Sequence, residues 1–586
     1  MEAPLRSQPL DKTDDHTLAN DGDGHHSRTM ARRKLDLLVL TFNAAKTIID
    51  SHVFAHHLQT ALAANATSLP EVVVFSLQEV SPLSYAFIGG VFLNPFLARY
   101  EDALNLAAVK VQSTPPSTLA TTATTSFGFS SANNVSVNAD SSEEPGPQTS
   151  LLELQQQSKP YTLVQQHNVG MTAVMVFARD PSAVSQVELA EVGFGTMDMG
   201  NKGAAGVRCL YADKEGGGRT TQLTFVATHL APMEWNLRRR NANWRTICSA
   251  LLFGEPTAVI KRAAGDEGQA AVAAAAAATS AVSGGRAQDS AACKEPTAEE
   301  EEEAERLLAE AEAANGALAA DVRAALRDIT IFRPGSHLFL AGDLNYRISE
   351  RSPQRDEPFP SLEMGSQHHW STFLDRDQLS RERAEGRALQ GLEEAPVNFA
   401  PTYKYHDLPT ADGALNEAQV REAEANGLLS AGLVVPFRFA KHRWPSWTDR
   451  VLYAGVPADA PARRGQGEDD ETARFDVVSY QSLPLMRSSD HQPVFLRVRV
   501  PILSPEELGR PSPATPAGNE VGGSSSRAKK PLYPIDIHAA ARRRAARSRE
   551  FATGWTMLLW CTREGAVALG SLAVLGLSTY WLYQAL

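Results

Sequence analysis

The stretch HLFLAGDLNYRI, residues 337–348, joins an apolar run directly to a dense polar cluster. Its first half, His337 to Ala341, predicts a buried β-strand. Its second half, GDLNYR at 342–347, brings a carboxylate, an amide and a guanidinium to the end of that strand. Loops that follow strands carry much of the chemistry of α/β proteins. This junction is therefore the starting point for a candidate site.

The same arrangement recurs along the chain. Further apolar runs that predict strands lie at 35–40, 71–77, 161–164, 172–177, 222–227, 475–480 and 494–500. Short polar clusters lie near the strand ends: LTFN at 40–43, SLQE at 76–79, GNKG at 200–203, THL at 228–230, PTYKY at 401–405, RWPSWTDR at 443–450 and SSDHQPV at 488–494. Because strands alternate with helical stretches, the pattern indicates an α/β or α+β class.

The residue types in these clusters restrict the chemistry. The chain has no GxSxG nucleophile elbow and no Walker GxxxxGK[ST] loop, which disfavours acyl transfer and nucleotide-driven transfer. The oxygen-rich side chains of Asn43, Glu79, Asp343 and Asp490 suit a hard cation such as Mg²⁺ rather than zinc. Amides and imidazoles around such a cation suit stabilisation of a pentavalent phosphoryl group. Water is then the expected nucleophile.

The ordered series LTFN, SLQEV, NKGAAGVR, THLAP with RRRN, GDLNYRI, PTYKY, PSWTDRVL and SDHQPV resembles the inositol polyphosphate 5-phosphatase family. That family belongs to the DNase I-like endonuclease/exonuclease/phosphatase superfamily, and the resemblance runs from about residue 35 to 500 outside two insertions. It implies an α+β fold, a four-layer sandwich of two packed mixed β-sheets flanked by helices. It also implies magnesium-dependent hydrolysis of the 5-phosphate of phosphoinositides.

The resemblance carries roles for individual residues. It implies that Asp343 orients or deprotonates the attacking water, that His491 touches the scissile phosphate, and that Asp449 holds the His491 imidazole. Further phosphate contacts are implied for Asn345, His229 and Asn201. The implied metal set is Glu79 with Asn43 beside it, and Asp490 directly or through water.

Substrate-binding residues follow from the same resemblance. Tyr403 and Lys404 resemble the residues that grip the 4-phosphate, and Lys441 and Arg443 match the family's basic pair before Trp447. Lys202 is placed with this group. A Tyr hydroxyl with a Lys/Arg cluster is a suitable clamp for a second phosphate. Two departures from the family pattern are Thr448, expected to matter little, and Gln492, expected to weaken phosphate affinity or shift substrate choice.

The chain divides into four predicted regions. Residues 1–33 are predicted to be disordered, and residues 34–501 form one catalytic domain. Its low-complexity insertions fall at about 113–150 and 263–298, the second leading into an acidic helical stretch to about 328. Residues 502–564 are predicted to be a flexible linker with a basic juxtamembrane segment. Residues 565–586, which carry no charge, are long enough for a transmembrane tail anchor.

Membrane attachment and substrate follow as expectations. Arginines before the apolar span place the catalytic domain in the cytosol, and the absence of basic residues after it favours the endoplasmic reticulum membrane. The expected partners are this membrane and a phosphoinositide lipid, with phosphatidylinositol 4,5-bisphosphate converted to phosphatidylinositol 4-phosphate. The chain is thereby similar to tail-anchored phosphoinositide 5-phosphatases of the fungal type.

Composition bounds the alternatives. The 586 residues carry a net charge of −12, which argues against a duplex-binding surface, and no nucleic-acid partner is expected. The four scattered cysteines form no CxxC pair, which argues against a disulfide framework or structural zinc. Two further functions stay open. One is another DNase I-like phosphoesterase, namely a soluble inositol polyphosphate 5-phosphatase, a sphingomyelinase or a nuclease. The other is an inactive membrane scaffold.

Overall fold

The structure is a computed structural model in which residues 33–64, 68–113, 159–215, 217–264, 320–407, 435–457, 460, 473–508 and 533–586 are described. The predicted disorder at 1–32, nearly all of both insertions and the acidic stretch up to 319 lie outside these residues. The end of that stretch is described as helix α10, Ala320–Asp328.

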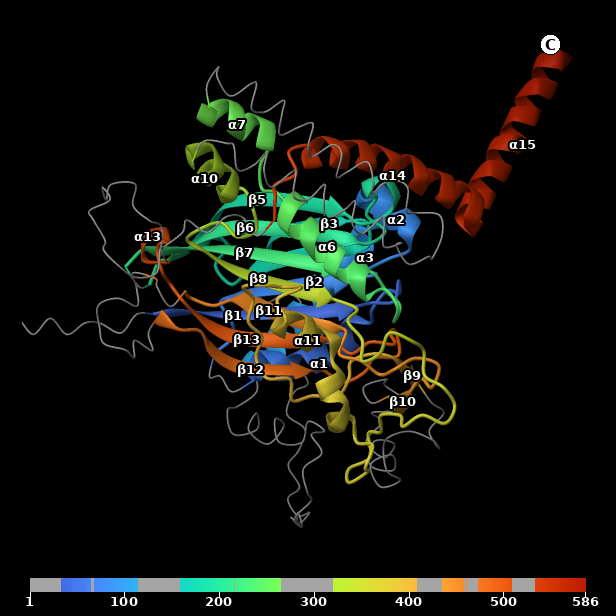
Figure 1. Ribbon diagram of the computed structural model, residues 1–586. Coiled ribbons are helices and arrows are strands. Elements are labelled where there is room, and N and C mark those ends of the chain that lie inside the picture. Colours follow the sequence, from blue (N-terminus) through green and yellow to red (C-terminus); the bar gives the residue numbers. More distant parts are fainter. Residues whose placement is uncertain are drawn as a thin grey trace, which may run out of the picture.

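Two β-sheets form the centre of the molecule (Figure 1). The first has the order β12-β13-β1-β2-β4-β3 and the second the order β11-β8-β7-β6-β5, with a small β10-β9 ribbon beside them. The first sheet contains β1 (Lys34–Asn43), β2 (Val72–Gln78), β3 (Thr162–Val169), β4 (Thr172–Ala178), β12 (Asp476–Ser482) and β13 (Val494–Pro501). The second contains β5 (Val184–Gly193), β6 (Gly203–Asp213), β7 (Arg219–His229), β8 (Ser336–Asp343) and β11 (Asp449–Ala454), and the ribbon is β9 (Tyr405–Asp407) and β10 (Phe437–Phe439).

Helices cover both outer faces of this pair of sheets (Figure 1). On the first sheet lie α1 (Ser51–Ala63) and α3 (Asn94–Ser113), and on the second lie α6 (Leu237–Ala250), α7 (Pro256–Ala264), α10 and α11 (Gln378–Ala384). The short elements are α2 (Leu83–Ile88), α13 (Pro505–Leu508) and the 3₁₀ turns η1 (Gly90–Phe92), η2 (Pro181–Ala183), η3 (Thr196–Asp198) and η5 (Trp370–Arg376). The expected α+β sandwich of two mixed β-sheets flanked by helices is confirmed.

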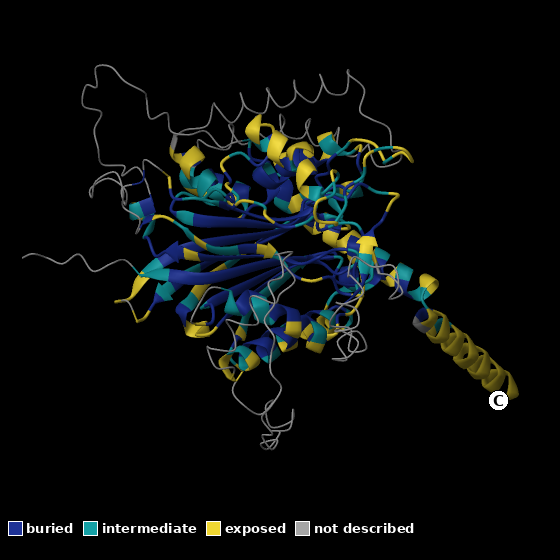
Figure 2. Cartoon of the chain, turned by 90° about the horizontal axis from the view of Figure 1, so that it is seen from below, coloured by how far each residue is buried: buried dark blue, intermediate teal, exposed yellow. Residues whose placement is uncertain are grey.

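Strand β1 shows why the sequence folds into these layers. Alternate residues of a strand point to opposite faces of its sheet. Leu37 and Val39 enter the core between the two sheets, whereas Leu38 and Leu40 enter the core beneath α1 and α3. A strand buried on both faces is a continuous apolar run rather than an alternating one. In Figure 2 the strands at the centre of the molecule are mostly dark blue, that is, buried.

The predicted strands all appear, with ends that differ by a few residues. The sequence did not predict strands β5, β6 and β11 or the β9–β10 ribbon. Strand β11 begins within the polar cluster RWPSWTDR, which hides its apolar run. Its Arg450 is almost fully buried and pairs with Glu394 through two hydrogen bonds of 2.6 and 2.7 Å, and with Asp377 at 3.0 Å. This buried ion network fixes the strand that begins at Asp449.

The C-terminal region differs from the predicted flexible linker. Residues 539–561 form helix α14 (Ala539–Cys561), which packs on the body of the protein, while residues 509–532 lie outside the described part. Alanine, glycine and one buried arginine–glutamate pair make up most of its inner face, so hydropathy does not mark it as amphipathic. Helix α15 (Arg563–Ala585) follows and projects from the domain (Figures 1 and 2). By length and composition, Gly565–Ala585 could cross a membrane.

Replacement of Arg450 by methionine should destabilise the protein by about 3–5 kcal/mol, because it removes the buried cation that joins the carboxylates of Asp377 and Glu394. The expected result is a lower urea midpoint, measured by tryptophan fluorescence. The matched control is Arg351→Met, which breaks an exposed pair with Glu357 and should leave the midpoint nearly unchanged. Equal midpoints for Arg450→Met and the control would contradict a structural role for this network.

Candidate active site

Strand direction brings the predicted residues to one end of the sandwich. Strands β1 and β2 run parallel, as do β7 and β8, so Asn43, Glu79, His229 and Asp343 lie at or just beyond carboxyl ends of strands. Strands β11 and β13 run antiparallel to β8 and β1. Their amino ends therefore reach the same region, which brings in Asp449 and the segment that holds His491.

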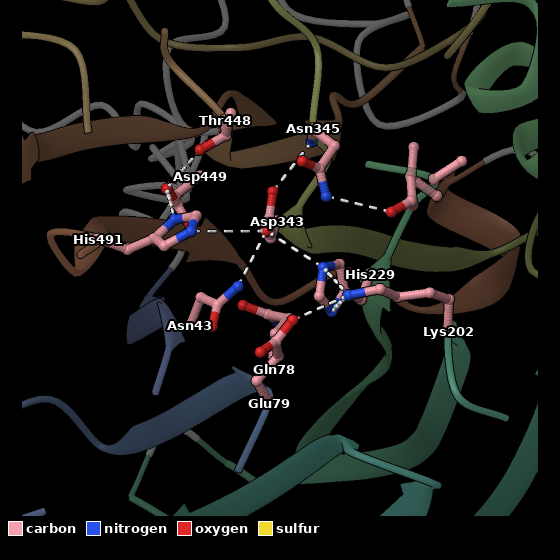
Figure 3. Close-up of polar contacts among 12 residues, drawn as sticks. Asn43, Gln78, Glu79, Lys202, His229, Asp343, Asn345, Thr448, Asp449 and His491 are labelled. Carbon is pink, nitrogen blue, oxygen red and sulfur yellow. Dashed lines mark hydrogen bonds and ion pairs between the residues drawn. The ribbon is translucent and has the colours of Figure 1, made fainter. Parts of the chain in front are cut away.

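Asp343 is the centre of the cluster (Figure 3). Its Oδ2 accepts a hydrogen bond from Asn43 Nδ2 at 3.0 Å and lies 3.2 Å from His229 Nε2 and 4.0 Å from His491 Nε2. Its Oδ1 accepts from the backbone N–H of Asn345 at 3.0 Å. Burial alone would raise the pKa of Asp343, but the rings of His229 and His491 outweigh burial and hold it well below its ordinary value.

The low pKa of Asp343 bears on its chemical role. A carboxylate that holds its proton so weakly is a poor general base but a strong hydrogen-bond acceptor. Of the two functions implied for Asp343, orientation of a water molecule therefore fits this environment better than its deprotonation.

His491 and Asp449 form the expected carboxylate–imidazole pair. His491 Nδ1 lies 2.9 Å from Asp449 Oδ2, which also accepts hydrogen bonds from Thr402 Oγ1 at 2.7 Å and Thr448 Oγ1 at 2.8 Å. Burial would lower the pKa of His491, but the carboxylates of Asp449, Asp343 and Asp490 outweigh it and raise the pKa to about 9. His491 is thus a buried cation at neutral pH, and Thr448 has a larger part in the site than expected.

Glu79 lies across the cluster from His491, beside Lys202 (Figure 3). Lys202 Nζ donates to Glu79 Oε1 at 3.0 Å and lies 2.7 Å from His229 Nε2, while Lys46 Nζ lies 3.2 Å from Glu79 Oε2. Burial would raise the pKa of Glu79, but the two ammonium groups and His229 lower it to about 2. Burial and the Lys202 ammonium lower the pKa of His229, so its imidazole is neutral.

The residues around Glu79 fit a hard divalent cation. The low pKa of the Glu79 carboxyl keeps it ionised, and it already pairs with two ammonium groups. The amide oxygen of Asn43 accepts a hydrogen bond from the backbone N–H of Ala45 at 3.0 Å. Oxygen donors of this kind are those that Mg²⁺ prefers. Asp490, which was also expected to support the metal, accepts a hydrogen bond on Oδ2 from Lys404 Nζ at 2.6 Å, and its Oδ1 lies 4.0 Å from His491 Nε2.

A second grouping of possible ligand atoms comprises Asp343, Asp449 and His491. Hydrogen bonding accounts for this grouping without a metal. Nδ1 of the His491 ring faces Asp449 Oδ2 at 2.9 Å, so this nitrogen and this oxygen are already engaged with each other. The set around Glu79 is therefore the better candidate for the metal.

The predicted phosphate clamp is only partly assembled. The rings of Tyr403 and His491 lie 4.5 Å apart between centroids, which places Tyr403 and its neighbour Lys404 beside the catalytic cluster. Arg443 is paired instead with the fully buried Glu234 at 2.9 Å. Lys441 is exposed, with no ion pair to another described residue.

Two predicted residues lie away from their expected partners. The Asn201 side chain is exposed and lies against Gly195. Among the described residues of this loop, its neighbour Lys202 reaches the catalytic cluster, where it contacts Glu79. Gln492 is buried, and its Oε1 accepts a hydrogen bond from Tyr405 rather than facing the cluster.

Arg347 belongs to the site although its role was not predicted. Its guanidinium stacks 4.4 Å from the centroid of the Tyr403 ring, and Nε donates to the backbone carbonyl of Asn345 at 3.0 Å. It therefore links the turn after β8 to the clamp. The available signal was its place in GDLNYR, two residues after Asn345, but spacing alone does not tell a buried arginine from a solvated one.

Fold and site define a class of protein, a DNase I-like sandwich with an acidic and imidazole-rich centre at one end. The family model described as Endonuclease/Exonuclease/phosphatase family 2 matches residues 40–497. The chain belongs to this family.

Individual relatives match over shorter stretches. A human phosphatidylinositol 3,4,5-trisphosphate 5-phosphatase 1 is 29% identical over 160 residues, which cover 27% of this chain and 11% of the relative. The inositol-1,4,5-trisphosphate 5-phosphatase 1 of Schizosaccharomyces pombe is 23% identical over 330 residues, 55% of this chain and 18% of the relative. The chain therefore matches less than a fifth of the length of either relative.

One solved structure is the inositol polyphosphate 5-phosphatase domain of SPsynaptojanin with inositol (1,4)-bisphosphate and calcium ion. It covers 80% of this chain and 85% of its own length, at 19% identity and a TM-score of 0.42.

The His491 ring should titrate near pH 9 in chelator-treated protein, which a pH series of NMR spectra of the ring nitrogens would measure. Because this pKa exceeds the ordinary value of 6.5, the stabilisation from His491 is complete below pH 6.5 and is lost as the pH rises through about 9. Asp449→Asn should lower the pKa of His491, whereas the exposed control Asp356→Asn should not. An unchanged His491 pKa in Asp449→Asn would refute the assigned pairing.

Proposed function

We propose that this chain is a magnesium-dependent phosphatase that removes the 5-phosphate of phosphoinositides, converting phosphatidylinositol 4,5-bisphosphate to phosphatidylinositol 4-phosphate. The observation that carries the proposal is the buried cluster in which ionised Asp343 lies between the imidazoles of His229 and His491. Family membership and relatives named as 5-phosphatases of a phosphoinositide and of an inositol phosphate support the same reaction.

The cluster supplies the parts needed for in-line attack of water on phosphorus. Asp343 orients the water, and the protonated His491 ring, held by Asp449, donates to the phosphoryl group. Lys202 adds positive charge and His229 a neutral ring on the opposite side, with the amide of Asn345 beside Asp343. The new phosphorus–oxygen bond to water forms as the phosphorus–oxygen bond to the inositol oxygen at C5 breaks. One proton is lost by the attacking water and one is gained by the leaving inositol oxygen, so the products are the free inositol hydroxyl and inorganic phosphate. Preorganised donors of this kind stabilise charge that develops in the transition state.

A Mg²⁺ ion held by Glu79 and Asn43 would supply Lewis-acid neutralisation of the phosphoryl oxygens. Glu79 already pairs with the ammonium groups of Lys202 and Lys46. A carboxylate that attracts two cationic side chains is a suitable ligand for a metal cation, which supports this placement. Asp490 is assigned instead to the orientation of Lys404, with which it pairs.

Substrate choice is assigned to Tyr403, Lys404, Lys441 and Arg443. Lys404 and Tyr403 lie beside His491 and would receive a 4-phosphate while the 5-phosphate occupies the cluster. The carboxylates of Asp490 and Glu234 keep Lys404 and Arg443 in place before the lipid arrives. A soluble inositol polyphosphate presents the same phosphates, and the name of the S. pombe relative favours it as the second candidate substrate.

Helix α15 is proposed to anchor the chain in a membrane, with the catalytic domain in the cytosol and the endoplasmic reticulum as the expected organelle. Its span Gly565–Ala585 is uncharged and almost entirely exposed. A membrane anchor raises the effective concentration of enzyme at the surface that holds the lipid.

The proposed reaction is tested by phosphate release from a panel of phosphoinositides and inositol phosphates in Mg²⁺. Wild-type protein should release phosphate from 5-phosphorylated substrates only. Asp343→Asn should reduce kcat/KM by at least about 10²-fold, the cost of losing one oriented polar group, while the exposed control Asp356→Asn retains activity. Equal release by wild type and Asp343→Asn would exclude the mechanism, and release confined to 3- or 4-phosphates would exclude the specificity.

The anchor is tested by deletion of residues 565–586. The shortened chain should move from the membrane pellet to the soluble fraction while retaining turnover of short-chain lipid. As a matched control, Gly570→Leu with Gly576→Leu keeps the span apolar and should stay in the pellet; a Cβ at either glycine meets no atom within 4 Å. Sedimentation of the shortened chain with membranes would contradict the anchor.

A further inference from the structure

Helix α14 lies against two segments that carry active-site residues. It packs on α2, which begins four residues after Glu79, and on η3, which lies four residues before Lys202. Glu79 and Lys202 form the ion pair at one side of the catalytic cluster. One helix outside the sandwich therefore contacts both of the segments that supply this pair, and Figure 1 shows it leading directly into α15.

The loop that carries Lys202, residues 194–202, is held by α14 through polar contacts. Glu550 Oε1 accepts a hydrogen bond from the backbone N–H of Gly200 at 2.5 Å. Arg543 Nη1 donates to the backbone carbonyl of Asp198 at 3.2 Å, and Arg542 Nε donates to the Asp198 carboxylate at 2.8 Å. Arg543 and Glu550 are themselves a buried pair, with Nη2 and Oε2 3.0 Å apart.

The loop has a backbone shape that needs such support. Met197 and Asp198 have positive φ angles of 54° and 61°, which are unfavourable for residues with a side chain. Gly200 lies against the β3–β4 hairpin so closely that an added Cβ would meet Val169 Cγ1 at 2.5 Å. The loop is thus confined between that hairpin and α14, and its last residue, Lys202, enters the catalytic cluster.

Helix α14 is fixed to the body independently of this loop. Gly554 allows close packing on α2, since a Cβ there would lie 3.0 Å from Phe87 and Ile88. Trp555 makes an edge contact with Phe92 at 5.8 Å between ring centroids. On its solvent side, Arg544 pairs with the exposed Glu255 at 2.8 Å. The helix is therefore a rigid support on which the loop rests.

We infer that α14 is a positioning element for catalysis, in which Glu550, with Arg543, holds the 194–202 loop so that Lys202 meets Glu79 and His229. Because the single extended residue Thr562 joins α14 to α15, the helix that would enter the membrane is attached directly to the helix that positions an active-site lysine. This inference rests on the proposed phosphatase function and assigns the C-terminal region a role in turnover as well as in attachment.

Full-length Glu550→Ala, Glu550→Gln and Arg544→Ala proteins in detergent test this assignment, with soluble inositol 1,4,5-trisphosphate as substrate. Glu550→Ala should lower kcat/KM by about tenfold or more, since displacing a positioned group by about 1 Å costs up to about 10²-fold. Glu550→Gln should recover most of the loss, because its amide oxygen can still accept from Gly200 N–H. Arg544→Ala, which breaks the Glu255 pair on the same helix, should match wild type.

Hydrogen exchange of the peptide that covers residues 194–203 gives a readout independent of activity. Exchange should rise in Glu550→Ala and in Gly554→Leu, which forces α14 away from α2, and should stay at the wild-type rate in Arg544→Ala. Unchanged exchange of the loop peptide in Glu550→Ala would overturn the inference. A Glu550→Ala protein with lowered thermal stability but a wild-type kcat/KM would also overturn it, because Glu550 would then serve stability alone. A wild-type protein without phosphate release would instead refute the proposed function, and loop exchange would still decide whether α14 holds the loop.

Discussion

The buried negative charge of Asp343 imposes a constraint that much of the surrounding structure meets. A carboxylate removed from water is costly unless hydrogen bonds and positive charge surround it. Asn43 comes from β1, His229 from β7 and His491 from the segment before β13, so both sheets contribute to that compensation. The two sheets must therefore meet at this end with their strand termini aligned, and the active-site geometry follows from the packing of the sandwich.

The same constraint explains the two different histidines. His491 faces the carboxylates of Asp449, Asp343 and Asp490 and is therefore a cation, whereas His229 lies beside the Lys202 ammonium and is neutral. Both histidines lie near Asp343, but the other charged groups around each ring differ, and these groups give the two rings different protonation states. A phosphoryl group bound between them would meet a charged donor on one side and a neutral ring with a lysine on the other.

Helix α14 changes how the domain and the membrane segment are related. A flexible linker would leave the catalytic domain free to reorient above the membrane, whereas a docked helix ties the start of α15 to α2 and to the loop of Lys202. The arginines of this segment serve that docking: Arg543 and Arg542 bond to Glu550 and Asp198 rather than standing free for lipid headgroups. The proposed membrane attachment and the active-site geometry would thereby share one structural element.

The sequence by itself determined the layers and most of the catalytic centre. Apolar runs such as Leu35–Leu40 predict strands buried on both faces. The ordered series of polar motifs, through its resemblance to a known family, identified Asp343, His491 and Asp449. The sequence also marked Gly565–Ala585 as a possible membrane span, because an uncharged stretch of that length is rare in a loop.

Only the tertiary structure decided how polar side chains are shared between partners. The motifs offered Asp490 as a metal ligand and Arg443 as a phosphate ligand, and only the three-dimensional structure shows that they pair with Lys404 and Glu234. The sequence did not predict helix α14, because the partners of its inner face also come together only in the tertiary structure. Its inner face is built from Ala546, Gly554 and the Arg543–Glu550 pair, whose burial depends on a surface contributed by residues more than 300 positions earlier in the chain.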